Sequence, residues 1–130
     1  MVKLIDTNII IRFLVSNDPL LVEKIAKYLK NQESTFVLTD VGVAELVWVL
    51  LSVYNLPKEA IIEKISGLIE LDNFTLSKSL IARTLAIYSQ HNIDYIDAFH
   101  AAYALENEIN EVVSYDKDFG KIKFLKRVEP

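Results

Sequence analysis

Short apolar runs alternate with longer amphipathic segments along the whole chain, and this alternation limits the folds that the chain can adopt. Apolar residues recur at helical spacing between the runs, for example over residues 21–29 and 61–69. Strands that alternate with helices predict a parallel α/β sandwich. The runs with the length and composition of strands cover residues 2–6, 35–38, 74–76 and 111–114, and a short edge strand is expected within 124–128.

Length and composition predict one domain over residues 1–130. A chain of this size with 52% hydrophobic residues buries roughly two-thirds of its unfolded surface. The sequence contains no cysteine, which excludes disulfides and thiolate zinc sites, and two histidines are too few for a histidine-based metal site. Because no secretory signal and no bilayer-spanning segment are visible, we expect a soluble, cytoplasmic protein with no membrane contact.

The net charge of −4 argues against nonspecific nucleic-acid binding through a large basic surface. It does not exclude a nucleic acid, because a bound divalent cation would change the sign of an acidic pocket. Basic residues also crowd the last fourteen positions, either as a solvated tail or as a nucleic-acid contact: Lys117, Lys121, Lys123, Lys126 and Arg127.

Two of the predicted strands end at an aspartate. Asp6 closes the first apolar run, and Asp116 follows the run at 111–114. In an open parallel sheet the carboxyl ends of the strands form the crevice where ligands bind. The alternative for Asp6 is a helix N-cap. Either Asp116 or Asp118 could cap the short helical turn that follows, and nearness to the strand end favours Asp116 as the functional acid.

Glu45 is the only charge in an apolar helix predicted over about residues 41–54. An unpaired carboxylate in such a helix must reach water, find a partner or bind a metal. The alternative is that Glu45 lies near the helix start, where a negative charge is favoured. We expect Trp48, one turn later, to lie in the core or at a subunit interface.

Asp94 and Asp97 begin another predicted helix, on the side that continues into its alanine-rich core face. Their spacing also mimics a capping box. Capping accounts well for Asp94 and less well for Asp97, so Asp97 is the preferred functional acid. We expect His100, one turn beyond Asp97, to be a structural histidine with its hydrogen bonds satisfied.

A parallel sheet would bring four of these acids to one edge. Asp6 and Asp116 would leave their strands there, and the helix starts that carry Glu45 and Asp97 follow from the same edge. Such a cluster repels itself unless protons or cations neutralise it. Oxygen ligands suit Mg²⁺ or Mn²⁺, which support phosphodiester hydrolysis by activating water and stabilising the displaced oxygen.

The segments that carry these acids resemble the PIN-domain family, especially the VapC-type toxins of prokaryotic toxin–antitoxin pairs. The resemblance rests on the order and spacing of LIDTN, VAELVWVL, DYIDAFHAAYA and VVSYDKDF, and it covers nearly the whole chain. It implies a three-layer α/β/α fold with a central parallel sheet and an Mg²⁺- or Mn²⁺-dependent ribonuclease. It also implies a homodimer that is neutralised by a small antitoxin protein.

The same resemblance assigns site residues. The four acids of the family fall on Asp6, Glu45, Asp97 and Asp116, with Asp6, Asp97 and Asp116 as metal ligands and Glu45 as a ligand or the orienter of the attacking water. A further acid often seen beside the third falls on Asp94, and small hydroxyl residues that help to hold the site fall on Thr7 and Ser114. Asp118 is an additional acid outside this set.

Three other functions compete with the nuclease. A receiver-like signalling module would need an acceptor aspartate after a central strand and a later lysine, where this chain has Glu45 on an apolar helix. A phosphatase would usually need a second aspartate two residues after the nucleophilic one, and Asn8 occupies that position. A non-catalytic PIN-like scaffold that binds RNA or protein would keep the same acids, and an absence of metal binding would favour it.

Overall fold

The computed structural model describes residues 1–130 as two compact units, Met1–Ser77 and Lys78–Pro130. Helices alternate with short strands along the chain, and every strand pair is parallel, so the predicted parallel α/β class is confirmed. The strands pair in two sheets, one within each unit. The prediction that residues 1–130 form one domain stays a prediction.

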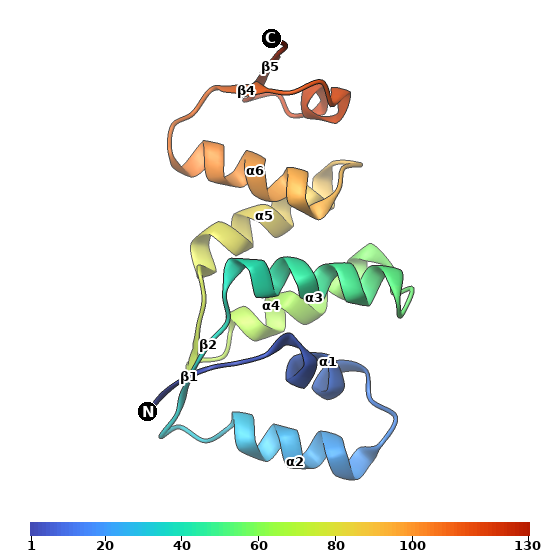
Figure 1. The fold of residues 1–130 in the computed structure, drawn as a ribbon, viewed down its shortest axis with the longest axis vertical. Coiled ribbons are helices and arrows are strands. Elements are labelled where there is room, and N and C mark those ends of the chain that lie inside the picture. Colours follow the sequence, from blue (N-terminus) through green and yellow to red (C-terminus); the bar gives the residue numbers. More distant parts are fainter. The chain divides into compact units, whose positions relative to one another are not determined.

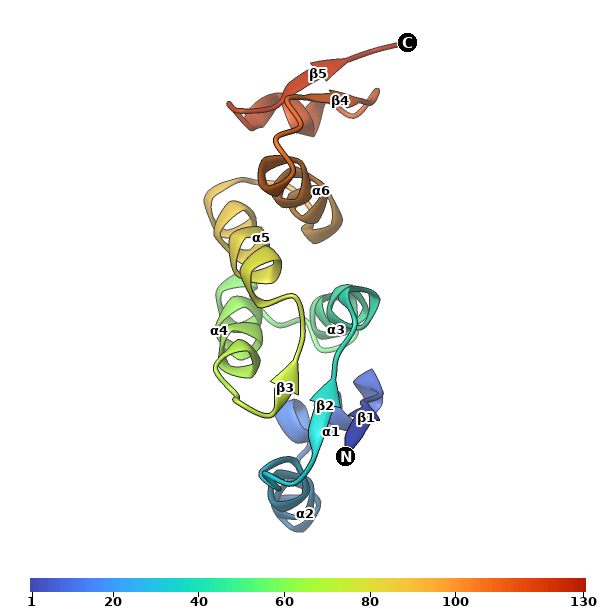
Figure 2. The ribbon, with the colours of Figure 1, turned by 90° about the vertical axis from the view of Figure 1, so that its left-hand side faces the viewer.

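The first unit contains a three-stranded sheet in the order β1-β2-β3, seen side by side in Figure 2. Its helices lie on one side of that sheet (Figure 1). This is expected, because each right-handed crossover connects a strand to the next strand along the sheet, always toward the same edge. The elements in chain order are β1 Val2–Leu4, α1 Thr7–Val15, α2 Pro19–Leu29, β2 Thr35–Val37, α3 Asp40–Ser52, α4 Lys58–Ile69 and β3 Phe74–Thr75.

The helix starts of the first unit use the capping residues that the sequence offers. The Asp18 carboxylate accepts hydrogen bonds from the Leu20 and Leu21 backbone N–H groups, and Pro19 occupies the first helical position of α2. Thr39 caps α3 through its hydroxyl, which accepts from the Gly42 N–H at 3.0 Å. Both helices therefore begin at a residue whose side chain satisfies backbone N–H groups of the first turn.

The second unit pairs two helices with a small parallel sheet. Its elements are α5 Lys78–Gln90, α6 Tyr95–Glu106, β4 Glu111–Val113, the 3₁₀ helix η1 Lys117–Lys121 and β5 Lys126–Val128. The buried alanines 98, 101 and 102 lie on α6, which packs closely on α5. Strand β5 is the predicted final strand, and its Arg127 is in register with Val112 of β4.

None of the helices is both long enough and apolar enough to cross a lipid bilayer.

Asn73 provides a test of how the first unit is held together. Its buried side-chain amide donates to the Leu29 carbonyl at 2.6 Å and to the Asn31 carbonyl at 3.4 Å. Asn73, which directly precedes β3, therefore satisfies backbone carbonyls at the C-terminal end of α2. We expect Asn73→Ala to lower the free energy of unfolding by about 1–3 kcal/mol in urea denaturation, because a buried carbonyl loses its donor. Asn73→Asp, which turns a carboxylate toward the carbonyls, should lower it further at pH 7. Two variants as stable as the wild type would show that this bond contributes nothing.

Candidate metal centre

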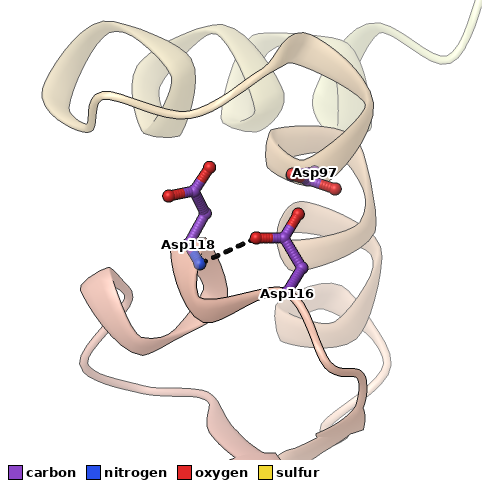
Figure 3. Close-up of side chains that lie close together, drawn as sticks. All are labelled: Asp97, Asp116 and Asp118. Carbon is purple, nitrogen blue, oxygen red and sulfur yellow. Dashed lines mark hydrogen bonds between the residues drawn. The ribbon is translucent and has the colours of Figure 1, made fainter.

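Three carboxylates gather in the second unit, where the first turn of α6 lies beside the start of η1 (Figure 3). One oxygen from each of Asp97, Asp116 and Asp118 lies within 4.8 Å of the other two. Asp97 and Asp118 are half-buried, and Asp116 is exposed. The structure therefore brings together two of the predicted site acids, Asp97 and Asp116, and adds Asp118 to them.

Two hydrogen bonds fix Asp116 directly after strand β4. The Ser114 hydroxyl accepts from the Asp116 backbone N–H at 2.9 Å. Asp116 Oδ1 in turn accepts from the Asp118 N–H at 2.9 Å and so caps η1. The sequence left open which aspartate caps this turn, and it is Asp116. Since the cap uses one carboxylate oxygen, the other oxygen of Asp116 remains available to a ligand.

Two basic residues hold the chain around this turn. Arg127 donates to the Ser114 carbonyl at 3.0 Å and pairs with Glu129 at 2.6 Å. Lys121 donates to the Asn92 carbonyl at 2.8 Å and pairs with Asp118 Oδ1 at 2.9 Å.

Lys121 and Arg127 were grouped in the sequence with a terminal basic cluster, and their support of the acidic turn was missed. The spacing of three residues between Asp118 and Lys121 was the one available signal for it. The other partners, Asn92 and the Ser114 carbonyl, are distant in the sequence and carry no such signal.

The pKa of Asp97 is raised above its ordinary value. The largest cause is burial, which removes water from the charged form, followed by repulsion from Asp116 and then from Asp94. A hydrogen bond with Asp116 and repulsion from Asp118 add to the rise. The cluster therefore carries more negative charge than its surroundings neutralise, and a proton or a cation is favoured there.

The donor set fits a hard divalent cation. All three residues offer carboxylate oxygens, which Mg²⁺ and Mn²⁺ prefer, and the surplus negative charge would be offset by the ion. A cavity of about 440 Å³ opens beside Asp97 and Asp116, and His100 and Ser114 also line it. A ligand could reach the carboxylates through this opening.

Two predictions for α6 are corrected. His100 was expected to be a structural histidine, but it is exposed, and its ring contact is with the adjacent Phe99. Asp94 was expected to lie along the core face and to cap the helix. It does occupy the N-cap position, yet it is exposed and makes no side-chain capping hydrogen bond. Its effect on the cluster is electrostatic, through the pKa of Asp97.

In the first unit, Asp6 is the N-cap of α1. Its Oδ1 accepts from the Asn8 N–H at 3.1 Å, and the carboxylate is exposed at the rim of a cavity of about 910 Å³ formed by β1, α1 and α2. Thr7 is buried directly behind it. A Cβ on Gly42 would lie 3.8 Å from Thr7 Oγ1, so the first turns of α1 and α3 are in close contact.

Glu45 lies one turn beyond Gly42 on α3 and is exposed, so its carboxylate reaches water. Trp48 is 64% exposed. The expectation that Trp48 lies in the core is therefore wrong, because α3 buries a different stripe, formed by Val43, Leu46, Val47 and Leu50. Asp6 and Glu45 belong to the first unit, and the Asp97–Asp116–Asp118 cluster belongs to the second.

Comparison with known proteins gives a consistent assignment. The family model for the PIN domain matches residues 3–125. A curated VapC ribonuclease from Aquifex aeolicus (strain VF5) is 30% identical over 98% of this chain and 96% of its own length.

Two solved structures also align with nearly the whole chain. One is VapBC2 from Rickettsia felis bound to a DNA fragment from its promoter, with 18% identity, coverage of 99% of this chain and 98% of the other, and a TM-score of 0.40. The other is a toxin–antitoxin complex from Klebsiella pneumoniae, with 19% identity, coverage of 96% and 95%, and a TM-score of 0.35.

The raised pKa of Asp97 predicts that this side chain costs stability when no metal is bound. A carboxyl whose folded pKa is raised stabilises the fold fully below its unfolded pKa, and that contribution is lost as the pH rises through the folded pKa. At pH 7 we therefore expect Asp97→Asn to raise the Tm of the metal-free protein, with a gain that shrinks as the pH falls. With Mn²⁺ present the order should reverse, since the ion stabilises only the wild type. A lower Tm for the metal-free variant at pH 7 would contradict the raised pKa.

Metal titration of single variants would define the ligand set of the cluster. We expect Asp116→Asn to weaken Mn²⁺ binding by roughly tenfold or more, because a ligand is lost. Asp118→Asn should weaken it by a smaller factor, because Lys121 already neutralises part of the negative charge of that carboxylate. Isothermal titration calorimetry measures both constants. Equal losses would make Asp118 a ligand of the same rank as Asp116.

Proposed function

Because the chain belongs to the PIN domain family, we propose that it is a divalent-metal-dependent endoribonuclease that hydrolyses RNA phosphodiester bonds. The cluster of Asp97, Asp116 and Asp118 carries this proposal, because it offers oxygen ligands with a surplus of negative charge. The relative named as a VapC ribonuclease supports the choice of reaction, since its similarity extends over 98% of the chain.

We assign the catalytic roles to the four acids of the family pattern. Asp6, Asp97 and Asp116 are the ligands of Mg²⁺ or Mn²⁺, and Glu45 is a further ligand or the residue that orients the attacking water. The ion, when bound, activates water and stabilises charge on the displaced oxygen. Asp6 and Asp116 each use one oxygen to cap a helix, so each would bind through its other oxygen.

Three further residues support these acids. Ser114 holds the backbone of Asp116 through its hydroxyl. Thr7 is buried next to Asp6 in the chain, and its hydroxyl lies beside Gly42 in the first turn of α3, so it helps to hold the start of α1 in place. Asp94 adds negative charge next to Asp97 and so favours a cation over an empty site.

We further propose that the protein acts in the cytoplasm as the toxin of a type II toxin–antitoxin pair, with a small antitoxin protein as partner. This role follows from the VapC-like pattern of the sequence. A homodimer follows from the same pattern. Its contact would use exposed apolar residues at and just beyond the C-terminal end of α3, Leu51, Val53 and Tyr54, because the central apolar residues of that helix are buried within the chain.

Cleavage of total cellular RNA by two paired variants tests the function. Asp6 and Asp18 are both exposed N-caps, each with a carboxylate oxygen 3.1 Å from a following backbone N–H. Asparagine caps helices as well as aspartate does, so both substitutions should preserve the fold. We expect Asp6→Asn to reduce cleavage in Mg²⁺ or Mn²⁺ by roughly a hundredfold or more, since a metal ligand is lost. Asp18→Asn should cut like the wild type, and chelator should stop all cleavage.

The outcome also separates the nuclease from the non-catalytic scaffold. Cleavage at discrete sites that needs both metal and Asp6 fits the nuclease, and the cut sites then begin to define the RNA substrate. Equal activity of the wild type and Asp6→Asn would mark the activity as a contaminant. No cleavage by any of the three proteins, together with unchanged RNA binding, would favour the scaffold.

A further inference from the structure

We propose that His100 contacts the RNA substrate by donating a hydrogen bond from a ring nitrogen to a phosphate oxygen, in the cavity beside the carboxylate cluster. This inference rests on the proposed ribonuclease function and adds a residue that positions the substrate. His100 is exposed on α6 and lines the same cavity of about 440 Å³ as Asp97, Ser114 and Asp116. All four residues belong to the second unit.

The position of His100 on α6 brings it beside a proposed metal ligand. It follows Asp97 by three residues, and side chains with this spacing are neighbours on one face of a helix, about 5–6 Å apart at their Cβ atoms. Ala104 continues the same face and also lines the cavity. The helix is firmly held, since it packs closely on α5 and its alanines 98, 101 and 102 are fully buried. His100 therefore has a fixed place along the cavity wall.

The ring nitrogens of His100 are not used within the chain. No hydrogen bond or ion pair joins them to another residue, Asp97 included, and the ring contact of His100 is with the neighbouring Phe99, at 6.4 Å between ring centroids. His91, the other histidine of the chain, has its Nδ1 3.0 Å from the Ile87 carbonyl oxygen, within hydrogen-bond distance. His100 therefore keeps its N–H group for a ligand in the cavity.

The wall of the cavity offers few hydrogen-bond donors to a phosphate. Its other titratable residues are Asp97, Tyr103, Glu111 and Asp116. No lysine or arginine lines it, so His100 carries the only side-chain nitrogen of the wall. A divalent cation on the carboxylates would attract a phosphate. A direct hydrogen bond from a side-chain N–H to that phosphate can come only from His100.

His100 also distinguishes an RNA phosphate from a basic side chain of a protein partner. The carboxylates alone would suit a metal ion, a lysine or an arginine. Imidazole carries at least one N–H whether it is neutral or protonated, and this N–H needs an acceptor. Lysine and arginine have donors only, so they would leave it without a partner. A phosphate oxygen is a negatively charged acceptor, and hydrogen bonds to such acceptors are the stronger ones.

NMR of the imidazole nitrogens tests the contact directly, because the chain has only two histidines. Asp6→Asn, chosen so that RNA is not consumed, is labelled with ¹⁵N-histidine and titrated with single-stranded oligoadenylate in Mg²⁺. We expect the RNA to shift the ring resonances of His100 beyond the change that Mg²⁺ alone causes. The resonances of His91 should stay in place, since His91 lies outside the cavity. Bound RNA with no shift at His100 would overturn the inference.

Substitutions of His100 measure what the contact contributes. In anisotropy titrations with the same RNA and parent, His100→Leu should bind roughly tenfold more weakly, because a hydrogen bond to a charged group is lost. His100→Gln keeps an N–H at similar reach and should stay within about threefold of the parent. In the otherwise wild-type chain, kcat/KM for RNA cleavage should follow the same order. Ile96→Ala, exposed on the same helix but outside the cavity, is the control and should change neither quantity.

Mn²⁺ titration separates a substrate contact from a metal ligand. His100→Leu should bind Mn²⁺ as the wild type does, since carboxylates supply the ligands. A loss of roughly tenfold or more would make His100 a ligand of the ion and overturn the inference.

The remaining contrary results are distinct. If His100→Gln loses as much RNA affinity as His100→Leu, the N–H group is not what the RNA contacts, and the inference is wrong. If His100→Leu binds and cuts RNA like its parents, the inference fails while the ribonuclease function stands. If Asp6→Asn does not bind RNA and the wild type does not cut it, the proposed function fails and the inference fails with it.

Discussion

Repulsion between carboxylates is the constraint on which the second unit depends. Asp97, Asp116 and Asp118 are held within reach of one another although their charges oppose this, and the cost appears as a raised pKa of Asp97. The surrounding bonds offset the repulsion in part: Lys121 neutralises Asp118, and the Ser114 hydroxyl and the Asp118 N–H fix Asp116. A fold that holds such an arrangement gives up stability for a binding site.

Helix capping and metal binding are compatible uses of one aspartate. From sequence alone the two roles compete for Asp6 and for Asp116. In the structure both residues cap a helix with one carboxylate oxygen, which leaves the second oxygen to a ligand. The cap also restricts the rotation of the side chain, so that the free oxygen is already oriented before a ligand arrives. Asp18 caps α2 with the same geometry as Asp6 caps α1, and neither residue belongs to the cluster of Asp97, Asp116 and Asp118, so the cap by itself does not identify a site.

The periodicity of the sequence was enough to predict where the helices and strands lie. It was not enough to predict which of their residues are exposed or which distant residues they contact. Helix starts such as Asp18-Pro19 and Thr39 were predictable because the signal lies within a few residues. The exposed side of α3 was not, because that helix is apolar on nearly every face and its pattern does not distinguish Trp48 from Leu50. The roles of Lys121 and Arg127 depend on Asn92 and Ser114, which are 29 and 13 residues away, and no local pattern encodes such contacts.

A protein with net negative charge that acts on a polyanion needs a compensating source of attraction. A divalent cation bound by the acids would supply part of it, because it would reverse the sign of the field where phosphate must approach. Before the ion binds, a proton on Asp97 is the alternative neutraliser, so metal binding and deprotonation of Asp97 are linked. In the proposed ribonuclease the acids would therefore repel RNA when no ion is bound and attract it when one is.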